Sequence, residues 1–244
     1  MINYFFDVDG TLTPSRKKID KTFEFFFGEW VNHQQGIGNK VFLITGSDKK
    51  KTLSQIGLPL YRLVDGVYQN SGNQLCVRNT ISYEKHWTYP KELIKDLQKI
   101  ASESQWFGKA ENNIEIRIGE FSNMPMMINF STVGRSANSV LRREYYNWDN
   151  EKEERKNIVH ELSNKYPRVC FSIGGEISID ILPKGRDKSQ ALSDMKEGEN
   201  IFIGDRCNLG GNDFEIATMS DRHYNVGSWE QTNEILVKLL PKNS

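Results

Sequence analysis

The sequence is poor in cysteine. Its three cysteines, Cys76, Cys170 and Cys207, lie far apart, and no Cys-x-x-Cys pair occurs among the 244 residues. An odd number of separated cysteines gives neither a disulfide framework nor a thiolate zinc site, so we expect a reducing, cytoplasmic setting. The four histidines are also scattered, and their spacing indicates no zinc site.

The sequence also lacks long apolar runs and an excess of charge. No run approaches the roughly 18 apolar residues that span a membrane, and the N-terminus has no basic segment followed by a long apolar one. We therefore expect no membrane association and no signal peptide. The 32 basic residues equal the 32 acidic residues, which argues against a surface for nucleic acid or another polyanion.

What the sequence does have is an apolar, aromatic-rich run at residues 2–6, typical of a short buried strand, followed by Asp7 and Asp9. On an extended backbone, side chains at i and i+2 point the same way, so both carboxylates should face one pocket. Two carboxylates ~4 Å apart repel by about 4 kcal/mol at an effective dielectric of ~20. A divalent cation removes this repulsion, and oxygen ligands suit Mg²⁺, so Asp7 and Asp9 are predicted metal ligands.

The next 70 residues alternate between helical and strand patterns. Apolar residues recur every three or four positions over about 20–35, and a further helix should begin near Ser47 or Asp48. Short apolar runs predict strands at 41–44, 60–67 and 74–77. Strands alternating with helices are typical of a parallel sheet covered by helices.

The pattern changes after residue 81. We predict helices over about 90–101, 138–147 and 151–165, and strands at 114–118, 126–131, 169–173 and 177–182, the last two joined as a hairpin through Gly174 and Gly175. Strand 114–118 alternates apolar and charged residues, so its charged side should face water. Antiparallel strands with helices indicate an inserted α+β domain at 82–185, flanked by a catalytic core of 1–81 and 186–244.

The first pattern returns at Lys188. A helix is predicted from there to Met195, then a strand at 200–205 ending in Asp205, then a C-terminal helix. In an open α/β sheet, ligands bind outside the carboxyl ends of the strands, where Asp7, Thr45 and Asp205 should lie.

Each of these positions has a chemical role that suits phosphoryl transfer. Asp7 can attack phosphorus and become an acyl phosphate, and Asp9 can exchange a proton with the attacking or leaving oxygen. Thr45 can hold phosphate oxygens, and Lys188 can neutralise charge between carboxylate and phosphoryl group. A simpler interpretation stays open for several of them, because Thr45 can be a helix cap, Lys188 a surface lysine and Asp205 a turn residue.

The metal site would be completed from the C-terminal segment. Asp205 can supply a further carboxylate, assisted by Asp213 or by the loop at 210–212. The four predicted metal ligands are therefore Asp7, Asp9, Asp205 and Asp213.

Residues 7–13, Asp-Val-Asp-Gly-Thr-Leu-Thr, resemble the nucleophile motif of the haloacid-dehalogenase (HAD) superfamily of phosphotransferases. Three more strings, at 129–135, 171–180 and 204–213, resemble motifs of its eukaryotic-type phosphomannomutases. The resemblance implies an α/β fold with a HAD-like Rossmannoid core carrying a parallel sheet, plus the inserted α+β cap domain with an antiparallel sheet. It identifies Asp7 as the nucleophile and Asp9 as the acid/base.

The same resemblance implies further properties. Its substrate-binding positions are Arg16, Arg117, Arg135, Arg142, Ser178 and Asp180. It implies Mg²⁺ and a hexose 1,6-bisphosphate activator as cofactors. The ligands would be hexose phosphates, and the chain would form a homodimer through the cap domain.

Three functions follow as hypotheses. The first is a phosphomannomutase that interconverts mannose 6-phosphate and mannose 1-phosphate through a phosphoaspartyl enzyme. The second is a Mg²⁺-dependent sugar-phosphate phosphatase with the same core. The third, a catalytically silent binding protein, is disfavoured by the intact set of Asp7, Asp9, Lys188 and Asp205.

Overall fold

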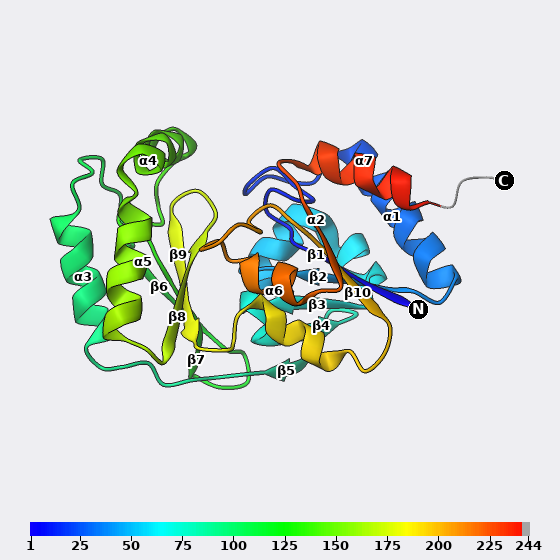
Figure 1. Ribbon diagram of the computed structural model, residues 1–244, viewed down its shortest axis with the longest axis horizontal. Coiled ribbons are helices and arrows are strands. Elements are labelled where there is room, and N and C mark those ends of the chain that lie inside the picture. Colours follow the sequence, from blue (N-terminus) through cyan, green and yellow to red (C-terminus); the bar gives the residue numbers. More distant parts are fainter. Residues whose placement is uncertain (241–244) are drawn as a thin grey trace. The chain divides into compact units, whose positions relative to one another are not determined.

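The computed structural model describes residues 1–240, which form two compact units (Figure 1). Within the described residues, unit 1 contains Met1–Tyr83, Lys188–Leu209 and residues 213–240. Unit 2 contains Glu84–Asp187 and the short loop Gly210–Asn212.

Unit 1 is built on a seven-stranded sheet in the order β11-β10-β1-β2-β3-β4-β5, in which β11 to β3 are parallel and β4 runs antiparallel to β3. The strands are β1 Ile2–Phe6, β2 Lys40–Ile44, β3 Gly66–Gln69, β4 Gln74–Val77, β5 Thr80–Glu84, β10 Glu199–Gly204 and β11 Arg222–Asn225. The central strand β1 therefore lies between β2, which follows it closely in sequence, and β10, which comes from the C-terminal segment.

Helices cover both faces of this sheet. The helices of unit 1 are α1 Lys21–Gly36, α2 Lys49–Leu63, α6 Phe214–Met219 and α7 Trp229–Leu239, with 3-10 helices η1 Asn70–Gly72 and η2 Lys188–Asp194. Tyr4 and Phe6 of β1 pack in the core cluster that contains α1, α2 and α7. Phe5 points to the other face and packs with η2 and α6. Because β1 is packed on both faces of the sheet, its position is fixed, and so is the position of the residues that follow it.

Unit 2 contains a four-stranded antiparallel sheet in the order β6-β7-β9-β8. Its strands are β6 Ile114–Ile118, β7 Pro125–Phe130, β8 Val169–Gly174 and β9 Ser178–Pro183, and its helices are α3 Leu93–Glu103, α4 Ser139–Lys152 and α5 Glu154–Lys165. One face of the sheet is apolar and packs against α3 and α5 through residues such as Leu97, Ile158 and Ile181. The other face carries polar side chains.

The α/β architecture, with a mainly parallel sheet and a separate antiparallel sheet, confirms the predicted fold class. The helix predicted from Lys188 is present as a 3-10 helix. Two local predictions were wrong. Leu60–Leu63 belong to α2 and not to a strand, because the helix resumes after a kink at Gly57 with Pro59 in its new first turn. The charged side of β6 does not simply face water, because Arg117 is buried.

The structure also bears on membrane association. Among the residues described, no helix combines the length and apolar character that crossing a bilayer requires.

Candidate active site

Asp7 follows β1 directly. Its backbone N–H donates to the carbonyl of Ile203 at 2.9 Å, which continues the parallel pairing of β1 with β10 by one residue. One carboxylate oxygen from each of Asp7, Asp205 and Asp213 lies within 4.8 Å of the other two. We call these three residues the acidic cluster. It lies at the carboxyl ends of the parallel strands, the edge where α/β sheets bind ligands.

Lys188, the first residue of η2, lies against the acidic cluster. Its ammonium donates to Asp7 Oδ1 at 2.5 Å and to Asp213 Oδ1 at 2.6 Å, and its side chain is 1% exposed. A buried lysine is stable only with charged partners, and the two carboxylates raise the pKa of Lys188 although burial lowers it. Lys188 therefore carries a fixed positive charge beside the Asp7 carboxylate.

The acidic cluster still holds more negative than positive charge. Arg206 lies 3.5 Å from Asp205 and, with Lys188, faces three carboxylates. Burial raises the pKa of Asp7 well above its usual range against the pull of Lys188, and Asp213 adds to the rise. Burial and then Asp213 raise the pKa of Asp205 to about 7. Clustered carboxylate oxygens that favour protons in this way suit a hard divalent cation such as Mg²⁺.

Gly10 makes room for this arrangement. Its φ of +87° is a left-handed conformation, and a Cβ at this position would lie 2.5 Å from Oδ2 of Asp205. The backbone therefore approaches the Asp205 carboxylate more closely than any residue with a side chain would allow. The three carboxylates of the acidic cluster lie close enough together to hold one cation.

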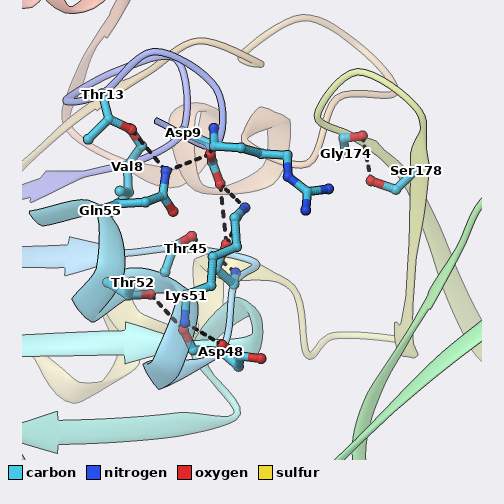
Figure 2. A network of polar contacts seen from close by, with 12 residues as sticks. Val8, Asp9, Thr13, Thr45, Asp48, Lys51, Thr52, Gln55, Gly174 and Ser178 are labelled. Atoms are coloured by element: carbon cyan, nitrogen blue, oxygen red, sulfur yellow. Dashed lines mark hydrogen bonds and ion pairs between the residues drawn. The ribbon is translucent and has the colours of Figure 1, made fainter. Parts of the chain in front are cut away.

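Asp9 is not part of the acidic cluster. Its carboxylate accepts hydrogen bonds from Lys51 Nζ at 2.5 Å and Gln55 Nε2 at 2.9 Å, both from α2, as Figure 2 shows. Ser47 Oγ at 3.2 Å and the backbone N–H of Arg16 at 2.8 Å complete the set. Burial raises the pKa of Asp9, but Lys51 and the other donors outweigh it and hold this pKa at about 2.

Thr45 and Arg16 complete the predicted residues of unit 1. Thr45 follows β2, is buried, and its hydroxyl accepts from the backbone N–H of Ser47 at 3.1 Å. Arg16 has a left-handed φ of 59°. This conformation lets its backbone N–H reach Asp9, as described above.

In unit 2, three predicted residues lie on the polar face of the sheet. Arg117 is buried on β6 and donates to Glu115 at 3.2 Å. Ser178 and Asp180 share one side of β9, as their i, i+2 spacing indicated. Asp180 accepts from Asn129 Nδ2 at 2.5 Å.

Two more contacts tie this polar face together. Asn212 Nδ2 donates to the second oxygen of Asp180 at 3.1 Å, and Ser178 Oγ donates to the carbonyl of Gly174 at 3.0 Å. Asp180 is therefore held from both of its oxygens by amide groups, which fixes its orientation.

Arg135 and Arg142 come from the segment between β7 and α4 and from α4 itself. Arg135 contacts Glu115 at 3.0 Å, so Arg117 and Arg135 share one carboxylate. Arg142 is buried and donates to the backbone carbonyls of Ala137 at 2.9 Å and Arg135 at 3.2 Å. The structure thus brings Arg135 and Arg142 together with each other and with Arg117.

With this geometry established, comparison with known proteins is informative. The family model for eukaryotic phosphomannomutase matches residues 37–242. The chain belongs to the eukaryotic phosphomannomutase family. Phosphomannomutase from Encephalitozoon cuniculi is 31% identical over 98% of this chain and 93% of its own length. Phosphomannomutase from Saccharomyces cerevisiae is 32% identical over 96% of this chain and 92% of its own.

Solved structures agree on the fold. A sugar phosphatase of HAD subclass IIB has a TM-score of 0.58 at 18% identity, covering 96% of this chain and 99% of its own. The sucrose-phosphatase from Synechocystis has a TM-score of 0.54 at 15% identity, and the match covers 97% of this chain and 87% of that one. The resemblance to the eukaryotic-type phosphomannomutases is confirmed by the family match and the relatives, and with it an enzyme of this type. The solved structures share its fold.

Several residues that shape the site escaped sequence reasoning. Lys51 stands last in a run of three lysines, a pattern that indicates only a solvated helix end. Its spacing of four from Gln55 puts both on one face of α2, which was the available signal. The sequence did not indicate the partners of Glu115 and Asn129, because these are set by strand register across the sheet.

Proposed function

We propose that this enzyme interconverts mannose 6-phosphate and mannose 1-phosphate through a phosphoaspartyl intermediate, with a hexose 1,6-bisphosphate as activator. The observation that carries the proposal is the buried Lys188 held between Asp7 and Asp213, beside Asp205, in a chain of this family. Carboxylates that hold a metal, with a lysine as fixed counter-charge, are the parts that phosphoryl transfer requires.

Asp7 is the proposed nucleophile. Its oxygen bonds to one phosphorus of the hexose 1,6-bisphosphate while the ester oxygen leaves on a hexose monophosphate. The phosphoryl group then passes from Asp7 to the free hydroxyl of the other hexose monophosphate, which forms the bisphosphate again. Lys188 supports both steps, because its positive charge lies 2.5 Å from the Asp7 carboxylate and can offset the charge of a phosphoryl group there. Asp9 is the proposed acid/base, and Thr45 the proposed phosphate contact.

Asp7, Asp205 and Asp213 would hold Mg²⁺, with Asp9 the fourth proposed position. When bound, the ion would neutralise charge on the transferring phosphoryl oxygens. The acidic cluster favours such an ion because the carboxylates of Asp7 and Asp213 are buried and that of Asp205 is half-buried beside them.

Arg16, Arg117, Arg135, Arg142, Ser178 and Asp180 are the proposed substrate-binding residues. Guanidinium groups bind phosphate through paired hydrogen bonds, so Arg135 and Arg142 suit the phosphate that is not reacting. Ser178 and Asp180, fixed on one side of β9, suit sugar hydroxyls. We propose that unit 2 is the cap that selects the substrate.

The setting of the enzyme is also a proposal. A neutral chain rich in neither cysteine nor apolar runs suits the cytoplasm and small hexose phosphates, with no nucleic acid or membrane as partner. A homodimer through the cap domain is the proposed assembly.

The rival function is a phosphatase, in which water takes the phosphoryl group from Asp7. The decisive experiment incubates the enzyme with mannose 1-phosphate, Mg²⁺ and a hexose 1,6-bisphosphate. Mannose 6-phosphate is measured by a coupled assay, and inorganic phosphate in parallel. We expect isomerisation to exceed phosphate release. Phosphate release without any isomerisation would establish the phosphatase instead.

A further inference from the structure

Asp9 is held by α2 through two side chains one helical turn apart. Lys51 reaches Oδ2 and Gln55 reaches Oδ1, as the dashed lines in Figure 2 show. Because α2 begins at its N-cap Asp48, which accepts from the backbone N–H of Lys51, the start of the helix is itself fixed. The carboxylate therefore has both oxygens tied to one rigid element.

Lys51 is the stronger of these two contacts. It is a charged donor at 2.5 Å, and its ammonium also donates to Ser47 Oγ at 2.9 Å, which in turn contacts Asp9. Charge-assisted hydrogen bonds are about twice as strong as neutral ones. The Lys51 side chain is 29% exposed and that of Asp9 is 20% exposed, so the pair lies at the surface of unit 1 and a reacting oxygen can approach it.

We infer that Lys51 is a positioning residue that orients the Asp9 carboxylate for proton transfer to and from the sugar oxygen. This inference rests on the proposed role of Asp9 as the acid/base. A free aspartate side chain turns about two bonds, and a misplacement of about 1 Å can cost a catalytic group as much as 100-fold in rate. With Lys51 and Gln55 in place, the Asp9 oxygens keep one orientation.

The inference predicts a defect that depends on the leaving group. When the phosphoryl group moves from a hexose 1,6-bisphosphate to Asp7, the P–O ester bond breaks and the P–O bond to Asp7 forms. The sugar oxygen takes a proton through Asp9, whose carboxylate is ionised in the free enzyme and must first gain that proton from water. With p-nitrophenyl phosphate the same bonds change, but p-nitrophenolate leaves as a stable anion without a proton. Only the first donor needs an oriented Asp9.

The experiment measures first-turnover phosphoryl transfer to the enzyme from each donor by rapid quench, at saturating donor and Mg²⁺. We expect Lys51→Met to slow transfer from the hexose bisphosphate by about 10- to 100-fold. We expect it to change transfer from p-nitrophenyl phosphate by less than about threefold. Lys50→Met is the matched control, because Lys50 is the exposed neighbour on the same helix, and it should change neither rate.

A second variant, Lys51→Arg, keeps the charge and should recover most of the lost rate. A thermal melt of Lys51→Met that matches Lys50→Met excludes a folding defect. Equal slowing with both donors, no slowing with either, or faster transfer would overturn the inference while leaving the proposed function standing. So would a raised KM for the bisphosphate with an unchanged rate at saturation, because Lys51 would then bind substrate. If the unmutated enzyme accepts a phosphoryl group from neither donor, the proposed function and the inference both fail.

Discussion

The two units cluster their charged side chains in opposite ways. In unit 1 three carboxylates converge, with the ammonium of Lys188 between two of them. In unit 2 two guanidinium groups, from Arg117 and Arg135, converge on the single carboxylate of Glu115. A buried charge is stable only with a partner of opposite sign. Unit 1 should therefore respond to cations and to rising pH, whereas unit 2 should respond to falling pH.

The largest effect is expected from a substitution of Asp7 in the acidic cluster of unit 1. Asp7→Asn should lower turnover by roughly 10⁴-fold or more, because an amide cannot form the phosphoaspartate. The amide has the same shape, so the folded structure should persist, as a circular dichroism spectrum would check. Measurable isomerisation well above background in a clean preparation would remove Asp7 as the nucleophile.

The next effect concerns the cation. Gly10→Ala adds a Cβ 2.5 Å from Asp205 Oδ2, so Asp205 must move and Mg²⁺ should be bound at least tenfold more weakly, at about 1.4 kcal/mol per decade. Gly38→Ala is the matched control, because its φ of +86° is nearly the same and a Cβ there meets nothing within 4 Å. Both variants carry the cost of a left-handed alanine, about 1–2 kcal/mol.

The measurement is the rise in melting temperature on adding Mg²⁺, supported by the Mg²⁺ dependence of turnover. Exhaustive chelation should abolish the activity of the unmutated enzyme. If Gly10→Ala and Gly38→Ala show the same Mg²⁺ dependence, the cation is not held beside Asp205.

A smaller effect tests the arginines of unit 2. Arg135→Ala should lower isomerisation by about tenfold to 150-fold, the equivalent of losing one charge-assisted contact of about 1.5–3 kcal/mol. Phosphate release from a small monoester with no second anionic group should change little. Arg142→Ala should act in the same direction, but its side chain is buried against backbone carbonyls, so its melting temperature must be compared.

The exposed Arg143 offers the matched control, and Arg143→Ala should leave both activities unchanged. Equal loss of isomerisation and hydrolysis in Arg135→Ala would mean that Arg135 stabilises the fold of unit 2 and does not bind a second phosphate.

The smallest effect tests the opposed pH responses in the metal-free enzyme. Asp205 has a folded pKa of about 7, above its unfolded value of about 3.9, so its contribution to stability is present at low pH and is lost as pH rises toward 7. In unit 2, Arg117 and Arg135 outweigh burial and lower the pKa of Glu115, so its contribution is lost as pH falls below about 4.3.

Hydrogen-exchange protection factors, resolved by segment in the presence of chelator, separate the two units. Protection of β1 and β10 should fall as pH rises from about 4 to about 7 and recover when Mg²⁺ is added. Protection of β6 and β7 should stay level over this range and fall below about pH 4. Parallel changes in all four strands would mean that the charged groups of neither unit dominate its stability.

Much of this fold could be predicted from local patterns. The alternation of residues 114–118 defined β6 to the residue, and the glycines at 174 and 175 marked the β8–β9 hairpin. The edge strand β11, Arg222–Asn225, was missed because it is polar and mostly exposed, so it carries no apolar run. The helix α6, with six residues, is too short for a periodic signal.

Some residues of the candidate site could also be predicted from local sequence patterns, and others could not. Residues at strand ends, such as Asp7 and Asp205, could be predicted from the sequence, because the apolar run of a buried strand shows where the strand ends. Residues on a helix face, such as Lys51, could not be chosen from their neighbours Lys49 and Lys50. Which of three lysines meets Asp9 depends on how α2 is rotated against β1, and only tertiary packing sets that rotation.

The place of β1 between β2 and β10 has a consequence for how the chain matures on the ribosome. About 190 residues separate β1 from β10, and at roughly 5–20 residues per second their synthesis takes about 10–40 s. During that interval β1 can pair only with β2. Asp7 has neither Lys188 nor Asp213 as a partner, because both are synthesised late. Nearly all of unit 2 is contiguous and is complete by residue 187. Unit 1 is synthesised partly before and partly after unit 2, so one edge of the aromatic strand β1 stays unpaired for a long period of synthesis, and unpaired strand edges are prone to aggregation.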